Sequence, residues 1–94
     1  IMMKRLFIDY ELTDGTIGSV RVYAADKVLA EKTCRLHSWP VEDGPRLMTL
    51  MLYSALKRAQ LTTEDYETFV DTVLVDYSAR AEDIDEANPT QSEN

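Results

Sequence analysis

The most reactive side chains of this sequence belong to Cys34 and His37, which are spaced as Cys-x-x-His. This spacing is half of a structural zinc site, but such a site needs four ligands, and the chain has one cysteine and one histidine. A thiol nucleophile would also need oxyanion donors and a third group that orients its base, and the surrounding residues offer neither. We therefore expect a thiol at the edge of the core and a histidine at the surface, with no part in catalysis or metal binding.

Two pairs of adjacent acids are the other candidates for chemistry: Glu64 with Asp65, and Glu82 with Asp83. Neighbouring side chains diverge along the chain, so neither pair converges on a shared proton or a metal ion. The first pair suits the first turn of a helix, where carboxylates oppose the helix dipole. No set of residues in the sequence predicts catalysis, a cofactor site or a metal site, and we expect a protein that is not an enzyme.

The elements that surround these residues are organised by the longest apolar stretch, PRLMTLMLYSALKRAQL, from Pro45 to Leu61. Its apolar side chains recur at helical spacing on two adjacent faces and leave only a narrow polar strip. A helix that is apolar nearly all round has to be covered on several sides, so we expect the flanking segments to pack on it. The apolar residues of the two faces are Leu47, Met48, Leu50, Met51, Leu52, Ala55, Leu56 and Ala59.

Residues 4–12 and 17–24 alternate in the manner of half-buried strands, and the turn between them decides which faces meet. A two-residue turn at Asp14 and Gly15 would place the apolar side chains of the second strand on the polar face of the first. A three-residue loop that begins at Thr13, with Gly15 left-handed, brings the apolar faces together. The register that we predict pairs Leu12 with Thr16, Ile8 with Val20 and Leu6 with Val22.

A helix from Lys27 to about His37 is predicted next. Asp26 is its predicted N-terminal cap, because the carboxylate can accept from the free amides of the first turn. Trp39 precedes a proline, and a residue in that position avoids the α conformation, so the helix ends before it. The predicted inner face consists of Val28, Leu29 and Leu36, with Thr33 beside them.

After the central helix, Thr62 as a cap and the acids that follow it predict a third helix that starts near Thr63. Two interpretations compete for residues 71–77, DTVLVDY. The apolar spacing that begins at Tyr66 supports a continued helix, whereas the β-branched residues and their alternation favour a strand. We favour a short helix that ends near Asp71, followed by a third strand beside the hairpin. The predicted fold class is α+β, with an N-terminal β-hairpin packed on a three-helix unit.

Acidic residues are concentrated in the last third of the chain. Residues 1–63 hold seven acids against nine Lys and Arg, whereas residues 64–94 hold ten acids against Arg80 alone, and the net charge is −7. Residues 79–94 contain one large apolar side chain, Ile84, and bury too little to offset the entropy of ordering. We therefore predict a single α+β domain at residues 1–78 and an acidic flexible tail at residues 79–94.

This distribution of charge argues against nucleic-acid binding, because phosphate backbones favour clustered Lys and Arg. No apolar run reaches the roughly 18 residues of a membrane span, and the N-terminus lacks the pattern of a signal peptide. A single cysteine fits a reducing compartment. We expect a cytoplasmic protein without a membrane partner. The oligomeric state stays open, with a homo-oligomer among the alternatives.

Several segments, taken in order, carry a resemblance. They are Arg21-Val22, ADKVLAEKTCRLHSWP, SALKRAQL, Phe69 with Asp71, and Asn88-Pro89-Thr90-Gln91. Together they resemble small proteins encoded in the tail-morphogenesis region of siphophages and prophages of actinobacteria, which look like tail assembly chaperones. The resemblance implies a protein that is not an enzyme and that keeps the long, helical tape measure protein soluble while tail-tube subunits assemble around it. It also implies that this chain is the shorter of two products, the longer one made by a programmed frameshift.

A chaperone of this kind needs an exposed apolar surface that meets helices, together with acidic residues that keep its complexes soluble. We expect Phe7, Tyr23, Trp39 and Tyr53 to be exposed and to bind the partner. The competing hypothesis is an acidic inhibitor that mimics DNA, which would spread carboxylates over a rigid face at phosphate-like spacing. Many of the acids lie in the predicted tail, so we prefer the chaperone.

Overall fold

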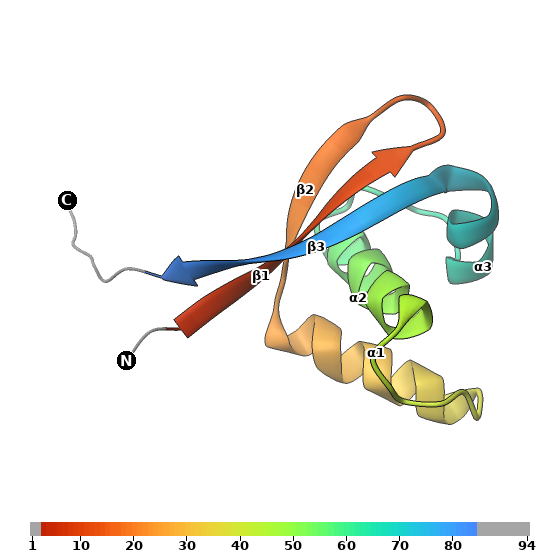
Figure 1. Cartoon of the computed structure of the whole chain (residues 1–94). Coiled ribbons are helices and arrows are strands. Elements are labelled where there is room, and N and C mark those ends of the chain that lie inside the picture. The colour runs from red at the N-terminus through yellow and green to blue at the C-terminus, as the bar shows by residue number, and fades with distance from the viewer. Residues whose placement is uncertain (1–2, 85–94) are drawn as a thin grey trace.

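Three antiparallel strands form a sheet in the order β2-β1-β3, and helices pack on one of its faces (Figure 1). The computed structural model describes residues 3–84. Its elements are β1 (Met3–Leu12), β2 (Ile17–Val22), α1 (Ala24–Leu36), α2 (Pro45–Arg58), α3 (Tyr66–Thr68), a π-helical turn (Phe69–Val73) and β3 (Leu74–Ile84). This arrangement confirms the predicted α+β class, with a hairpin packed on three helices and a third strand in the sheet.

The hairpin has the predicted register. Ile8 lies opposite Val20, and Leu6 lies opposite Val22. The Leu12 amide donates to the Thr16 carbonyl at 2.9 Å, and Gly15 adopts a φ of 92°, which a side chain would disfavour. The three-residue loop therefore brings the apolar faces of both strands onto the helices, as the alternation of the sequence requires.

The third strand is confirmed, but it is longer than the sequence predicts. Residues 79–84, which we assigned to the flexible tail, pair with residues 3–8 of β1. The domain boundary at residue 78 is therefore wrong. Ala79 and Ala81 supply little apolar area, but their small side chains fit the face that carries Leu6 and Ile8, while Arg80 projects to the other face and pairs with Asp9 at 3.0 Å. Residues 85–94, the rest of the predicted tail, lie outside the described range.

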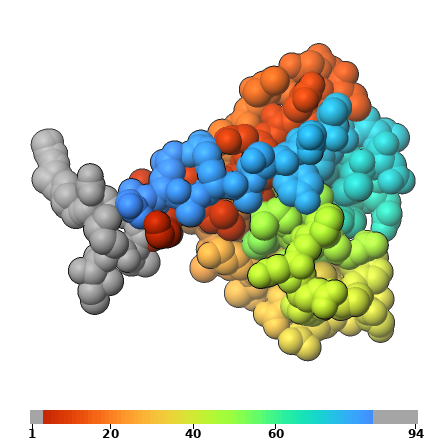
Figure 2. Space-filling view, in the orientation of Figure 1, coloured from red at the N-terminus to blue at the C-terminus, as the bar shows by residue number. Residues whose placement is uncertain are grey.

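The outer halves of β1 and β3 form a ribbon that extends past the helices (Figures 1 and 2). Near its end, the Lys4 ammonium lies 2.8 Å from the Asp83 carboxylate. Both side chains are exposed, so this ion pair contributes little stability. Backbone hydrogen bonds between the two strands are the main interaction that holds the ribbon together.

The core lies where α2 crosses the sheet, which confirms that the apolar stretch from residue 45 is the central element. α2 lies between the sheet and α1 (Figure 1). Its inner side chains contact those of β1 and β2, and Phe69 of the π-helical turn closes one end. None of the helices within residues 3–84 combines the length and the apolarity needed to cross a membrane. The buried core residues are Ile8, Tyr10, Val22, Ala30, Cys34, Leu50, Met51, Leu52, Leu56 and Phe69.

The third helix starts later than predicted, because Asp65 and not Thr62 is its cap. The Asp65 carboxylate accepts from the Thr68 amide at 2.8 Å. The Thr62 hydroxyl instead accepts from the Glu64 amide at 3.3 Å, which stabilises the loop before the helix. A single α-helical turn then widens into the π-helical turn, and the chain enters β3 at Leu74.

Truncation tests the extended strand. A chain that ends at Ser78 loses the pairing of six residues with β1, and we expect its free energy of unfolding to fall by about 3 kcal/mol relative to a chain that ends at Ile84. Urea denaturation of the two chains measures the difference. Equal stabilities would show that the outer half of β3 is not formed in solution.

Candidate functional site

The junction between β2 and α1 is held by Asp26, although not in the role that the sequence predicts. α1 begins at Ala24, and Tyr23 is its N-cap residue, so the helix starts three residues before the predicted start at Lys27. Asp26 lies in the first turn, where its carboxylate accepts from the Tyr23 amide at 2.8 Å. Asp26 is therefore not the cap. Its carboxylate faces the start of the helix and the interior of the protein, and the residue is 1% exposed.

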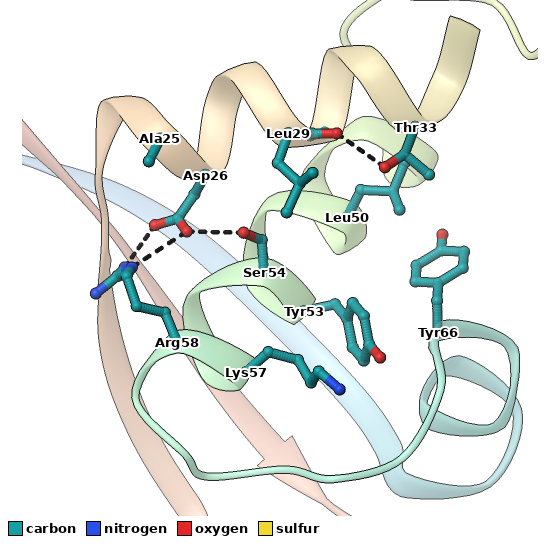
Figure 3. A pocket seen from close by; sticks show the side chains of 11 residues that line it. Ala25, Asp26, Leu29, Thr33, Leu50, Tyr53, Ser54, Lys57, Arg58 and Tyr66 are labelled. Carbon is teal, nitrogen blue, oxygen red and sulfur yellow. Dashed lines mark hydrogen bonds and ion pairs between the residues drawn. The ribbon is translucent and has the colours of Figure 1, made fainter. Parts of the chain in front are cut away.

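Two side chains of α2 complete the contacts of this carboxylate (Figure 3). The Ser54 hydroxyl donates to Oδ1 at 2.8 Å. The Arg58 guanidinium donates from Nη2 to Oδ2 at 2.5 Å and from Nε to Oδ1 at 3.4 Å. Burial by itself raises the pKa of Asp26, but the hydrogen bonds from Arg58, the Tyr23 amide and Ser54, with the charge of Arg58, outweigh it and hold this pKa below its ordinary value. The carboxylate is therefore ionised at neutral pH and ties α1 to α2.

This tie fixes which face of α1 meets α2. Asp26, Ala30 and Cys34 follow one another at intervals of four residues, and all three are buried. Val28 and Leu36 lie almost opposite that stripe and are 64% and 74% exposed. The predicted inner face of Val28, Leu29 and Leu36 is therefore wrong. The buried face of α1 is thus the one that carries the hydrogen-bonded carboxylate, and not the one that carries the largest apolar side chains.

A groove runs along the line where α1 and α2 meet, with a volume of about 470 Å³ (Figure 3). Small side chains, among them those of Ala30 and Ser54, line the groove between the two helices. Larger side chains form its two walls. Leu29 forms part of one wall and is 50% exposed. Tyr53 stands on the other side, and Tyr66 lies at the far end. The remaining lining residues are Ala25, Asp26, Thr33, Leu50, Lys57 and Arg58.

The residues predicted to bind a partner do not form one surface, and three of them are less exposed than expected. Phe7, Trp39 and Tyr53 are half-buried, whereas Tyr23 is 46% exposed. Phe7 lies on the outer face of the sheet beneath the Arg80 guanidinium, 4.8 Å from its ring centroid. The expectation that all four are exposed is therefore wrong, and their role in binding stays a prediction.

Tyr53 is the predicted residue that lines the groove. Its ring lies 5.7 Å from that of Tyr66, which in turn lies 6.2 Å from that of Trp39. The Tyr53 hydroxyl donates to the Glu64 carbonyl at 2.6 Å, which fixes the ring against the loop before α3. Trp39 and Tyr53 are thus connected through Tyr66, while Phe7 and Tyr23 lie elsewhere.

Cys34 and His37 lie as the sequence predicts. Cys34 is buried against α2, whereas His37 is exposed and stacks on Trp39 at 4.3 Å. Among the residues that the structure describes, no group of three or more His, Cys, Asp or Glu side chains is placed to hold a metal ion. The groove between α1 and α2 is the feature of the described residues that we consider for a binding role.

The cluster of Asp26, Ser54 and Arg58 and the groove beside it were missed by sequence reasoning. One signal was present: Ser54 and Arg58 are four residues apart, which places two donors on one face of a helix that is otherwise apolar. Such a pair predicts a buried acceptor on a neighbouring element, although it does not identify Asp26.

Comparison with known proteins adds no relative to this description. No family model matches the sequence, no curated protein matches it, and no solved structure matches the fold.

The buried carboxylate is expected to contribute strongly to stability. Asp26→Ala leaves Arg58 and Ser54 without their acceptor, and we expect the free energy of unfolding to fall by about 3 kcal/mol. Asp43→Ala removes an exposed acid from the loop after α1 and is the matched control, with an expected change within about 0.5 kcal/mol. Denaturant unfolding of both variants measures these effects, and equal effects would contradict the role of Asp26.

The lowered pKa also fixes the sign of the pH dependence. The stabilisation by ionised Asp26 is complete above its ordinary pKa of 3.8 and is lost as the pH falls through the lower pKa of the folded protein. Asp26→Asn cannot titrate. The difference in stability between the two proteins should therefore be constant above about pH 5 and should shrink on further acidification.

Trp39 is expected to report a packed environment in the isolated protein. Its ring stacks on His37, and the Arg46 guanidinium lies 3.9 Å from its centroid. We expect blue-shifted tryptophan emission without any partner, and a loss of about 2 kcal/mol in Trp39→Ala, because the ring is half-buried. Emission typical of a fully exposed indole would contradict this packing.

Proposed function

We propose that this protein is a tail assembly chaperone-like protein that is not an enzyme, and that the groove between α1 and α2 binds amphipathic helices of a phage tape measure protein. The groove is the observation that carries the proposal. It is lined mainly by apolar side chains, and Leu29 is half exposed on its rim. Such a groove is a common docking site for the apolar face of a helix.

The residues that line the groove extend along both helices, from Arg58 at one end to Tyr66 at the other, and this arrangement suits a helix. The floor of the groove follows two packed helices, and its walls are side chains such as Leu29 and Tyr53 on either flank. A helix laid along this line would place residues at i, i+3, i+4 and i+7 between the walls and cover the exposed apolar area of Leu29. Tyr53 and Tyr66 offer broad, rigid surfaces for such contacts.

The rest of the proposal follows from the resemblance of the sequence. The protein would act in the cytoplasm of the bacterial host. There it would bind the exposed apolar stripes of the helical tape measure protein until tail-tube subunits surround them. The net charge of −7 would keep such complexes apart by mutual repulsion. Covering the apolar stripes of a helix and keeping complexes apart by charge require no catalytic residues, cofactor or metal ion.

Co-expression tests the proposal. Tagged full-length protein is produced with fragments of the tape measure protein from the same genome, and captured complexes are washed at low salt and at about 1 M salt. We expect helical fragments to be retained at both, because apolar burial is not screened by ions. Leu29→Asp should abolish capture. Val28→Asp, the same change on the exposed side of α1, should not.

Two outcomes would contradict the chaperone. Failure to retain any fragment at either salt concentration would end the proposal. Salt-labile capture of a DNA-binding protein would instead support the acidic DNA mimic, whose contacts are charge pairs that salt weakens.

A further inference from the structure

The edge of the sheet at β3 is open. Among the strands of residues 3–84, β3 pairs with β1 alone, and Figure 2 shows it uncovered at the surface. The residues from Ser78 to Asp83 are all exposed. Edge strands are commonly kept short or carry proline or lysine, which hinder pairing with other chains. β3 has eleven residues, contains neither residue type and pairs regularly with β1 from Asp76 to Ile84.

The hydrogen bonds of β1 show which backbone groups of β3 face this edge. The Leu12 amide donates across the hairpin at 2.9 Å, whereas the Thr13 amide donates to the Val73 carbonyl, just before β3, at 2.8 Å. Backbone groups alternate in direction along an antiparallel strand, so the odd-numbered residues of β1 bond to β3. Their partners are the even-numbered residues of 76–84. The amides and carbonyls of the odd-numbered residues between them therefore point to the open edge.

The ribbon of β1 and β3 has the most to gain from a further strand. β2 reaches only to Leu6, so β3 is the one partner strand of residues 3–5. Ala79 and Ala81 lie on the same face as Leu6 and Ile8, and both alanines are exposed. A two-stranded ribbon is marginally stable in water, and a third strand strengthens it.

We propose that the open edge of β3 pairs with β3 of a second copy of this chain, antiparallel and about a twofold axis at Ala81. A twofold contact uses the same surface on both copies, so it closes as a dimer. The axis is perpendicular to the sheet, and the two sheets merge into one whose helices all lie on the same face. The inference concerns the sheet and does not depend on the groove.

The side chains on both faces are complementary in this register. Arg80 lies opposite Glu82 of the second copy, and Glu82 lies opposite Arg80 of that copy. Within one chain Arg80 also forms an ion pair with Glu82, so four charges of alternating sign surround the axis. Arg5 of β1 lies opposite Glu82 and continues the alternation. On the face that carries the helices, the Ala81 residues of both copies meet, and Leu6 beside each completes an apolar row.

Other registers bring like charges together or leave the ribbon unpaired. An axis at Arg80 or Glu82 places that residue opposite its own copy, and an axis at Ala79 places Asp76 opposite Glu82. Like charges directly opposite each other destabilise a sheet. An axis nearer the start of β3 leaves the outer part of the ribbon without a regular partner. A second copy paired about Ala81 therefore fits the open edge through the charges of β3 itself.

Cross-linking tests the register. Ala81→Cys places the Cα atoms of two cysteines roughly 5.5 Å apart across the axis, within reach of a short bismaleimide. Ser78→Cys, on the same strand, places them roughly 20 Å apart. Ser19→Cys lies on β2, the other edge strand. We expect a covalent dimer from Ala81→Cys alone, because the native thiol of Cys34 is buried and is common to all three variants.

Proline tests the hydrogen bonds. Ala81→Pro removes an amide that points to the open edge and none that bonds to β1, so the fold should persist, as circular dichroism can check. Ile17→Pro makes the matched change at the first residue of β2. Sedimentation of the full chain over a range of concentrations gives the dissociation constant of the dimer. We expect Ala81→Pro to raise it at least tenfold and Ile17→Pro to leave it unchanged.

A charge reversal covers the case in which proline impairs folding. Glu82→Arg changes an exposed site and places like charges opposite each other across the axis, so it should raise the dissociation constant as Ala81→Pro does. A monomer at every concentration would overturn the inference, as would a dimer that neither variant weakens. Cross-linking through Ser78→Cys or Ser19→Cys would contradict the proposed pairing. Capture of tape measure fragments is measured separately, so the proposed function stands or fails on its own.

Discussion

The ion pair between Asp26 and Arg58 is the interaction on which the arrangement of the helices depends. Removing a carboxylate from water is costly, and here the cost is offset by hydrogen bonds from a guanidinium, a hydroxyl and a backbone amide. These donors come from the start of α1 and the last turns of α2. The tie therefore fixes the position of α1 along α2 and its rotation, and through the rotation it decides which apolar side chains remain in water.

The parts of the fold that follow from local periodicity could be predicted. The hairpin register was determined by an alternation of period two and by a glycine at the left-handed position, because a shift of one residue would have exposed every apolar side chain. α2 was recognisable because a long helix that is apolar on most sides has few other stable environments. The start of β3 was evident from its β-branched residues, which strands accommodate well.

The groove and the orientation of α1 could not be predicted, because they depend on residues that hydropathy treats as unimportant. Ala30 and Cys34 are buried where their small side chains fit against α2. Asp26 is buried because Arg58, Ser54 and the Tyr23 amide donate hydrogen bonds to its carboxylate. Val28 and Leu36 are more apolar but lie in water. Likewise, the outer half of β3 is held by backbone pairing with β1 rather than by apolar area. Sequence patterns report apolar area, whereas these features arise from contacts between distant segments.

The order of strands has a consequence for how the chain folds. β1 is the central strand, and its two partners are β2, the next strand along the chain, and β3, the last element of the described range. On the ribosome, the hairpin and both long helices emerge before β3 is synthesised, so one edge of β1 remains open during most of translation. Pairing across nearly the whole chain is slow, since a long loop must close first. Until then, the unpaired edge of β1 is the part of the nascent protein most exposed to wrong strand pairing.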